Sequence, residues 1–181
     1  MPFDPALPAA NSPNSSAEMR AQLTALKALI DAQPATAFGK VAADWTSGSS
    51  SFTDVTGLAF AVAAGESWTA EVVLHVISGT SGQGLKFRVA GPGAGGVMIA
   101  IMGTGSSGST AIECEVQTAF SVASPAKTFC SGSSLTGVVR IHVVVVNASA
   151  AGSVQLQASN SSGSGTVTIK ANSNLVARKT G

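Results

Sequence analysis

The feature that most restricts the fold is the texture of residues 40–178. Short runs rich in Val, Ile, Thr and aromatic residues are separated there by Gly/Ser clusters. This texture predicts an all-β, antiparallel sandwich or barrel. The predicted strands cover residues 41–46, 52–55, 58–62, 67–78, 85–90, 97–102, 111–118, 128–130, 138–147, 154–159, 166–171 and 175–178.

Several of these runs alternate between apolar and polar side chains. Leu85, Phe87 and Val89 point to one side of their strand, and Lys86 and Arg88 point to the other. Such alternation is typical of half-buried antiparallel strands, so we expect the apolar side to face the core. Two further runs share the pattern: Ile112, Cys114 and Val116 oppose Glu113, Glu115 and Gln117, and Val167 and Ile169 oppose Thr166, Thr168 and Lys170.

Two predicted strands are apolar on both faces. The run 138–146 has Val or Ile at four positions of one face, and again at Val144 and Val146 on the other. Residues 68–77 are also largely apolar on both faces. A strand of this kind needs cover on two sides. A neighbouring subunit is the first candidate for the second cover, and long loops over a central strand are the alternative.

One helix is predicted before this region, over residues 15–33. Ser15 and Glu18 have the spacing of a capping box, and Pro34 ends the helix because proline disfavours helical geometry in the preceding residue. A helix this short is marginal alone in water, so it needs a partner. It either lies on the domain that follows or forms a self-associating stalk. Its apolar residues have the four-three-four spacing of a coiled-coil seam: Met19, Leu23, Leu26 and Ile30, with Leu29 on one flank.

The composition favours the stalk. Only 10% of the 181 residues are charged and 45% are hydrophobic, so burial between subunits would compensate for a surface with few charges. The net charge of +1 includes no basic cluster beyond Arg178-Lys179, which argues against nucleic-acid binding. No apolar run is long enough for a membrane span, and the first residues lack the features of a signal peptide. We therefore expect synthesis in the cytoplasm, with Cys114 and Cys130 as buried thiols rather than a disulfide.

No pattern in the chain predicts catalysis or a cofactor. Residues 91–96 match Gly-x-Gly-x-x-Gly, but a β-like run follows where a dinucleotide site needs a helix. His75 and His142 lie inside predicted strands without a catalytic partner at a recognisable spacing, which favours histidines on a sheet surface or interface. The histidines, cysteines and carboxylates form no metal-site pattern. We expect a protein that is not an enzyme and binds no cofactor or metal.

Several segments occur in an order that resembles a known family: Asp44-Trp45, residues 52–58, 84–86, Gly91-Pro92, 152–157 and 166–171. Over residues 40–178 the chain is similar to the C-terminal β-domain of small bacteriophage virion proteins, which occur on tail fibres and on capsid-attached fibres or decorations. The resemblance implies a homotrimeric jelly roll, similar in shape to tumour-necrosis-factor-like trimers and often preceded by a coiled coil.

The expected organisation is an extended attachment peptide at 1–14, a trimerisation helix at 15–33, a linker at 34–39 and a β-sandwich domain at 40–181. The peptide is too poor in apolar residues to order itself alone, and its anchors to the virion would be Phe3 and Leu7. The trimerisation residues would be Met19, Leu23, Leu26 and Ile30.

Three functions follow as hypotheses. The first is a structural protein: a homotrimeric decoration or short head fibre on the virion surface, bound to capsid or tail proteins. The second is a tail-fibre tip that recognises a host surface glycan or protein. The third is an enzyme acting on polysaccharide, which two Trp and no Tyr disfavour, because sugar-binding grooves are normally lined with these residues.

Overall fold

The computed structural model describes residues 16–79, 82–105, 112–123, 125, 127–132 and 134–181. The chain divides into two units, with the boundary between Ala35 and Thr36. The described part of the first unit contains one helix, α1 (Ser16–Asp31), in which no residue is buried. The helix ends two residues before the predicted limit, and Ser15 of the predicted capping box lies outside the described residues.

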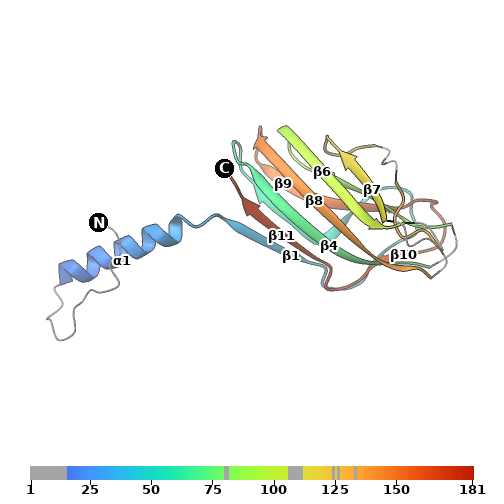
Figure 1. Cartoon of the computed structure of the whole chain (residues 1–181), viewed down its shortest axis with the longest axis horizontal. Helices are drawn as coiled ribbons and strands as arrows, with labels where there is room; N and C mark the ends of the chain where they lie inside the picture. Colours follow the sequence, from blue (N-terminus) through green and yellow to red (C-terminus); the bar gives the residue numbers. More distant parts are fainter. Residues whose placement is uncertain (1–15, 80–81, 106–111, 124, 126, 133) are drawn as a thin grey trace. The chain divides into compact units, whose positions relative to one another are not determined.

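The second unit, from Thr36 to Gly181, consists of antiparallel strands in two sheets (Figure 1). The strands are β1 (Thr36–Lys40), β2 (Trp45–Ser47), β3 (Thr53–Val62), β4 (Trp68–Ser78), β5 (Leu85–Ala90), β6 (Ala94–Thr104), β7 (Ile112–Gln117), β8 (Thr136–Ala148), β9 (Gly152–Asn160), β10 (Val167–Ile169) and β11 (Asn174–Lys179). Sheet A has the order β1-β11-β4-β8-β6-β7, and β10 joins it by pairing with β4 and β2. Sheet B has the order β3-β9-β5.

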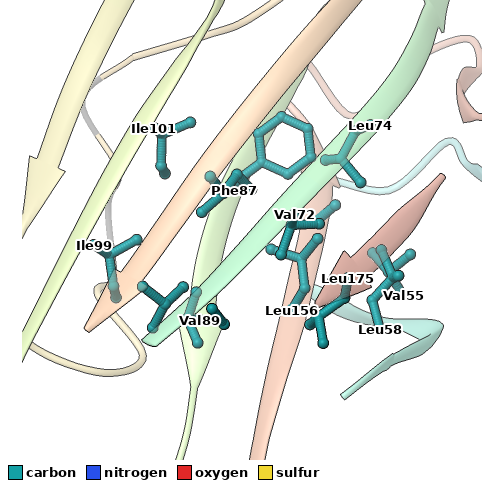
Figure 2. Packing of buried hydrophobic residues seen from close by; sticks show 14 of the residues in the cluster. Val55, Leu58, Val72, Leu74, Phe87, Val89, Ile99, Ile101, Leu156 and Leu175 are labelled. Carbon is teal, nitrogen blue, oxygen red and sulfur yellow. The ribbon is translucent and has the colours of Figure 1, made fainter. Parts of the chain in front are cut away.

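The core lies between the facing sides of the two sheets. Leu74 of β4 and Ile101 of β6 point from sheet A toward Phe87 of sheet B, and all three are fully buried (Figure 2). The ring of Phe87 lies 6.0 Å from that of Phe129, at a tilt of 49°. Tilted aromatic pairs of this kind contribute about 0.5–1.5 kcal/mol beyond the area that they bury.

Close contacts join the two sheets along one side of the sandwich, between β1 and β3. A Cβ atom at Gly39 would lie 2.4 Å from the carbonyl oxygen of Gly57, and a Cβ atom at Gly57 would lie 2.2 Å from the carbonyl oxygen of Lys40. Gly57 also has a φ of +88°, in the region that glycine adopts without steric cost. These backbones can therefore approach one another only because both positions are glycine.

On the opposite side, the chain that follows β7 runs along the edge of β5. Phe129 and Leu85 exchange two backbone hydrogen bonds of 2.8 Å, and the Ser121 N–H donates to the Val89 carbonyl at 2.8 Å. Residues 128–130, predicted as a strand, form only this bridge. The segment covers the edge of sheet B without extending it as a regular strand.

The prediction of an all-β, antiparallel architecture with one short helix is confirmed. The predicted strands agree within two residues at each end with β4, β5, β7, β8, β9, β10 and β11. These strands have the longest or cleanest apolar patterns, and Val139, Ile141, Val143 and Val145 of β8 are all buried as expected. The predicted strand 41–46 is less accurate, because β2 covers only Trp45–Ser47.

The predicted linker 34–39 is wrong in its second half. Residues 36–40 form β1, which pairs with β11 so that Phe38 lies opposite Val176. The five residues of β1 include an alanine and a glycine, and their strand conformation depends on a partner near the C-terminus. Such a distant partner leaves no signal in the local sequence.

The two predicted strands 52–55 and 58–62 form the single strand β3. The register with β9 shifts between Asp54 and Ala59, so the intervening residues form a bulge rather than a turn. The Thr56-Gly57 pair, which resembles a turn in the sequence, lies within this bulge.

Candidate interaction surface

The side of sheet A that faces away from sheet B, here the outer face, carries the exposed large apolar side chains of the β-domain. Every such side chain that the structure describes in this unit lies on that face. Their exposed fractions run from 45% to 76%, and they are Phe38, Met98, Met102, Ile112, Val116, Val138 and Val146.

Strand register places five of these seven side chains in two groups, and the other two, Val138 and Val146, lie on β8 between them. The smaller group, the Phe38 edge, is Phe38 on β1 with Val176 beside it on β11. The larger group, the β6–β7 patch, is formed by Met98, Met102, Ile112, Cys114 and Val116. In it Met102 lies opposite Cys114, and Val144 of β8 extends it beside Met98.

A polar strip separates the two groups. It consists of Glu71 on β4, Arg140 and His142 on β8, and Arg178 on β11. The Glu71 carboxylate lies 3.5 Å from the Arg140 guanidinium, and both side chains are more than half exposed, so water and salt weaken this pair. Val176, Glu71, His142 and Arg178 also line a shallow hollow of about 280 Å³. The strip therefore offers charges of both signs.

The orientation of β7 is opposite to the one predicted. Glu115 and Gln117 face the interior and are 9% and 3% exposed, whereas Ile112 and Val116 face outward and are 75% and 59% exposed. Alternation along the strand is present, but its polar side is the buried one. The expectation that Cys114 is buried is wrong for the same reason, since it shares the outward side.

Hydrogen bonds from the neighbouring segments stabilise this reversed strand. The Glu115 carboxylate accepts from the backbone N–H of Lys127 at 2.9 Å and from Nε2 of Gln117 at 3.0 Å. Nε2 of Gln117 also donates to the Phe87 carbonyl at 3.0 Å. Glu113 adds an ion pair of 2.8 Å with the Lys127 ammonium, which raises the pKa of that lysine. Polar partners inside the sandwich thus allow the apolar side chains of β7 to face outward.

The predicted trimerisation residues of α1 are also exposed. Met19, Leu23, Leu26 and Ile30 are 52%, 65%, 40% and 62% exposed. Their spacing puts them on one side of the helix. The predicted attachment residues Phe3 and Leu7 lie outside the described residues.

The ionisable groups of the β-domain outside this face hold turns together. The Glu66 carboxylate accepts hydrogen bonds from the Ala63 backbone N–H, the Lys179 ammonium and the Trp68 indole, which together lower its pKa to about 2. Lys170 and the Ala171 N–H lower the pKa of Asp44 in the same way. Such partners are those of structural carboxylates, and they stabilise the ionised form.

The histidine and cysteine side chains that were considered as catalytic or metal-binding groups do not lie together in one site. His75 and His142 are exposed on the outer face, where the sequence placed them, and Cys130 is a buried free thiol whose pKa burial raises. Within the described part of the chain, no group of three or more His, Cys, Asp or Glu side chains could hold a metal ion.

Phe38 is the main residue of this surface that the sequence analysis missed, because it was assigned to the linker. Its only signal was a single aromatic residue between Pro34 and the first predicted strand. The strands apolar on both faces did indicate a second apolar surface. Their alternative explanation, cover by long loops, does not hold for Val138 and Val146, which are 45% and 51% exposed.

No protein-family model and no curated protein matches this chain. Among solved structures, it is weakly similar to the VP2 subviral particle of infectious bursal disease virus, with 12% identity, a TM-score of 0.26, and coverage of 82% of this chain and 37% of that chain. A structure of the Gt strain of that virus gives 10% identity, a TM-score of 0.23, and coverage of 82% and 38%. The chain thus spans well under half the length of the structures it matches. None of the described helices is long and apolar enough to cross a membrane.

Proposed function

We propose that this chain is a structural protein of a virion surface, a bacteriophage decoration or short fibre that assembles as a homotrimer. The observation that carries the proposal is the exposed seam of α1, in which Met19, Leu23, Leu26 and Ile30 are all at least 40% exposed. The proposed kind of assembly, a homotrimer on a virion, is the one implied by the resemblance of residues 40–178 to the β-domains of phage virion proteins. In this proposal the sandwich is a jelly roll.

The energetics of α1 favour self-association. A helix of 16 residues is marginal in water by itself. Fully burying one large aliphatic side chain contributes about 1.5–3 kcal/mol, and the seam offers four such side chains per copy. A bundle of three helices would bury them together, so the same contacts that order the helix would hold the copies together.

Residues 1–14 provide the attachment in this proposal. Phe3 and Leu7 would anchor the segment to a capsid or tail protein, and the β-domain would project from the particle surface. The partners are then two further copies of the chain and one virion protein. No role for nucleic acid, membrane, cofactor or metal is part of the proposal.

Light scattering on the full chain tests the self-association. We expect three times the chain mass of 17.8 kDa, and a lower mass for the variant Leu23→Asp/Leu26→Asp. The matched control is Ala21→Asp/Thr24→Asp, which places the same two charges on the opposite side of the helix and should leave the mass unchanged. A seam variant that keeps the wild-type mass would exclude the stalk.

Binding of labelled protein to particles and to host cells tests the location. We expect binding to particles that lack this protein, and loss of binding for Phe3→Asp/Leu7→Asp. Binding to cells alone would instead support the tail-fibre tip that recognises a host glycan or protein.

A further inference from the structure

We propose that neighbouring copies of this chain meet through the outer face of sheet A, where the Phe38 edge of one copy packs against the β6–β7 patch of the next. The inference rests on the homotrimer proposed above. It adds a second contact between copies, made by residues outside the helix seam. The two halves of this contact lie on different strands.

The reversed orientation of β7 favours an outer face that is covered by protein in the assembly rather than exposed to solvent. A strand facing solvent would turn Ile112 and Val116 toward the core, where each would gain about 1.5–3 kcal/mol from burial. This strand instead buries Glu115, whose carboxylate needs donors from Lys127 and Gln117 to offset its desolvation. Such an arrangement is stable overall if the outward apolar side chains are covered in the assembly.

The outer face is also large enough for a protein contact. Six strands about 4.8 Å apart, with roughly nine residues each at about 3.3 Å per residue, span about 24 Å by 30 Å. The whole face therefore measures about 700 Å², an upper limit for the Phe38 edge and the β6–β7 patch together, and each partner contributes roughly 800 Å² to a standard interface.

The short connection between α1 and β1 favours another copy of the chain as the partner. Asp31 ends the helix and Thr36 begins β1, so the chain between them spans at most about 17 Å. Helices joined by their seams therefore hold the β1 strands of neighbouring copies close together. Phe38, which is 76% exposed, is then carried to within reach of the adjacent β-domain.

The shapes of the two groups argue for contact between unlike surfaces. The Phe38 edge is a single protruding ring on an edge strand, whereas the β6–β7 patch is broad and contains Met98 and Met102. Methionine side chains are flexible and adapt to an inserted ring. A closed ring of three copies needs such a heterologous contact, because a surface that pairs with itself gives a dimer.

Disulfide trapping in the full chain tests this contact directly. The exposed thiol of Cys114 lies in the β6–β7 patch, so Phe38→Cys should form an intermolecular disulfide with it under mild oxidation by diamide. Because each copy contributes one thiol of each kind, we expect covalent species up to the trimer, which disappear when Cys114→Ser is added. Cross-linked dimers that persist with Cys114→Ser would mean that Phe38 meets Phe38, and would overturn the inference.

Light scattering on charged variants gives a second measurement. Phe38→Asp and Met102→Asp should each lower the mass, whereas Ala61→Asp, at an exposed position of sheet B, should leave it unchanged. If both outer-face variants keep the trimer mass while Leu23→Asp/Leu26→Asp loses it, this inference fails and the proposed function stands. A wild-type chain that is monomeric would refute both.

Discussion

Replacing Glu115 by alanine removes the acceptor on which the reversed strand β7 depends. The Lys127 backbone N–H then loses its 2.9 Å hydrogen bond, and Nε2 of Gln117 loses one of its two acceptors. An unsatisfied buried polar group costs about 1–3 kcal/mol. We therefore expect Glu115→Ala to lower the free energy of unfolding by about 1–3 kcal/mol.

Urea unfolding at one fixed protomer concentration measures this loss. With a slope of about 2 kcal/mol per molar urea, the midpoint should fall by about 0.5–1.5 M. Glu115→Gln keeps one acceptor oxygen and should lose about half as much. Hydrogen exchange should quicken most at the Lys127 N–H, since this is the group left without its acceptor.

Glu113→Ala is the matched control. Glu113 lies on the same strand and bonds to the same lysine, but through an ion pair whose side chains are 32% and 46% exposed. Solvent screens such a pair, so the midpoint should change much less than for Glu115→Ala. Equal midpoints for the two alanine variants would refute the view that buried hydrogen bonds hold β7 in its reversed orientation.

Three further variants test other parts of the fold. The pKa of Glu66 is lowered from 4.5 to about 2, so its contribution to stability is complete above pH 4.5 and is lost as the pH falls toward 2. When the urea midpoint is measured as a function of pH, Glu66→Gln should therefore show a smaller change over this pH range than the wild-type chain. Gly57→Ala should destabilise far more than Gly65→Ala in thermal melts, because both have positive φ but only the Gly57 Cβ atom would strike a backbone oxygen, that of Lys40 at 2.2 Å. Ile141→Ala removes a fully buried side chain and should cost about 2–5 kcal/mol in urea unfolding; a loss below 1 kcal/mol would contradict its place in the core.

The sequence predicts the core strands well because burial on one side leaves an apolar repeat of period two. Leu85, Phe87 and Val89 are buried as that repeat indicates, and Val167 and Ile169 behave likewise. The repeat reports that the two sides of a strand differ. It does not report which side is inward when polar side chains have partners inside, as Glu115 has.

The outer face was predictable only in part. Val138 and Val146 on a strand that is apolar on both sides indicated a second apolar surface, and the structure places both exposed on the outer face of sheet A. Phe38 could not be assigned to that face from sequence, because its strand exists only through pairing with β11. A long-range partner of this kind has no local signature, and the same holds for the Lys127 N–H that satisfies Glu115.

Because β1 is the first strand of the β-domain, it would carry any mechanical force that acts between the N-terminal segment and the sandwich. If the N-terminal segment is fastened to a particle, any drag on the sandwich is transmitted through Thr36 into this strand. Among the described pairings, β1 is joined to sheet A by β11 alone, over the five residue pairs from Thr36–Arg178 to Lys40–Asn174. A force across the strand separates these pairs one after another, whereas a force along it loads all five together. The force needed to detach β1 would then depend on these five residue pairs and on the close contact between Gly39 and Gly57, while the core of the sandwich stays folded.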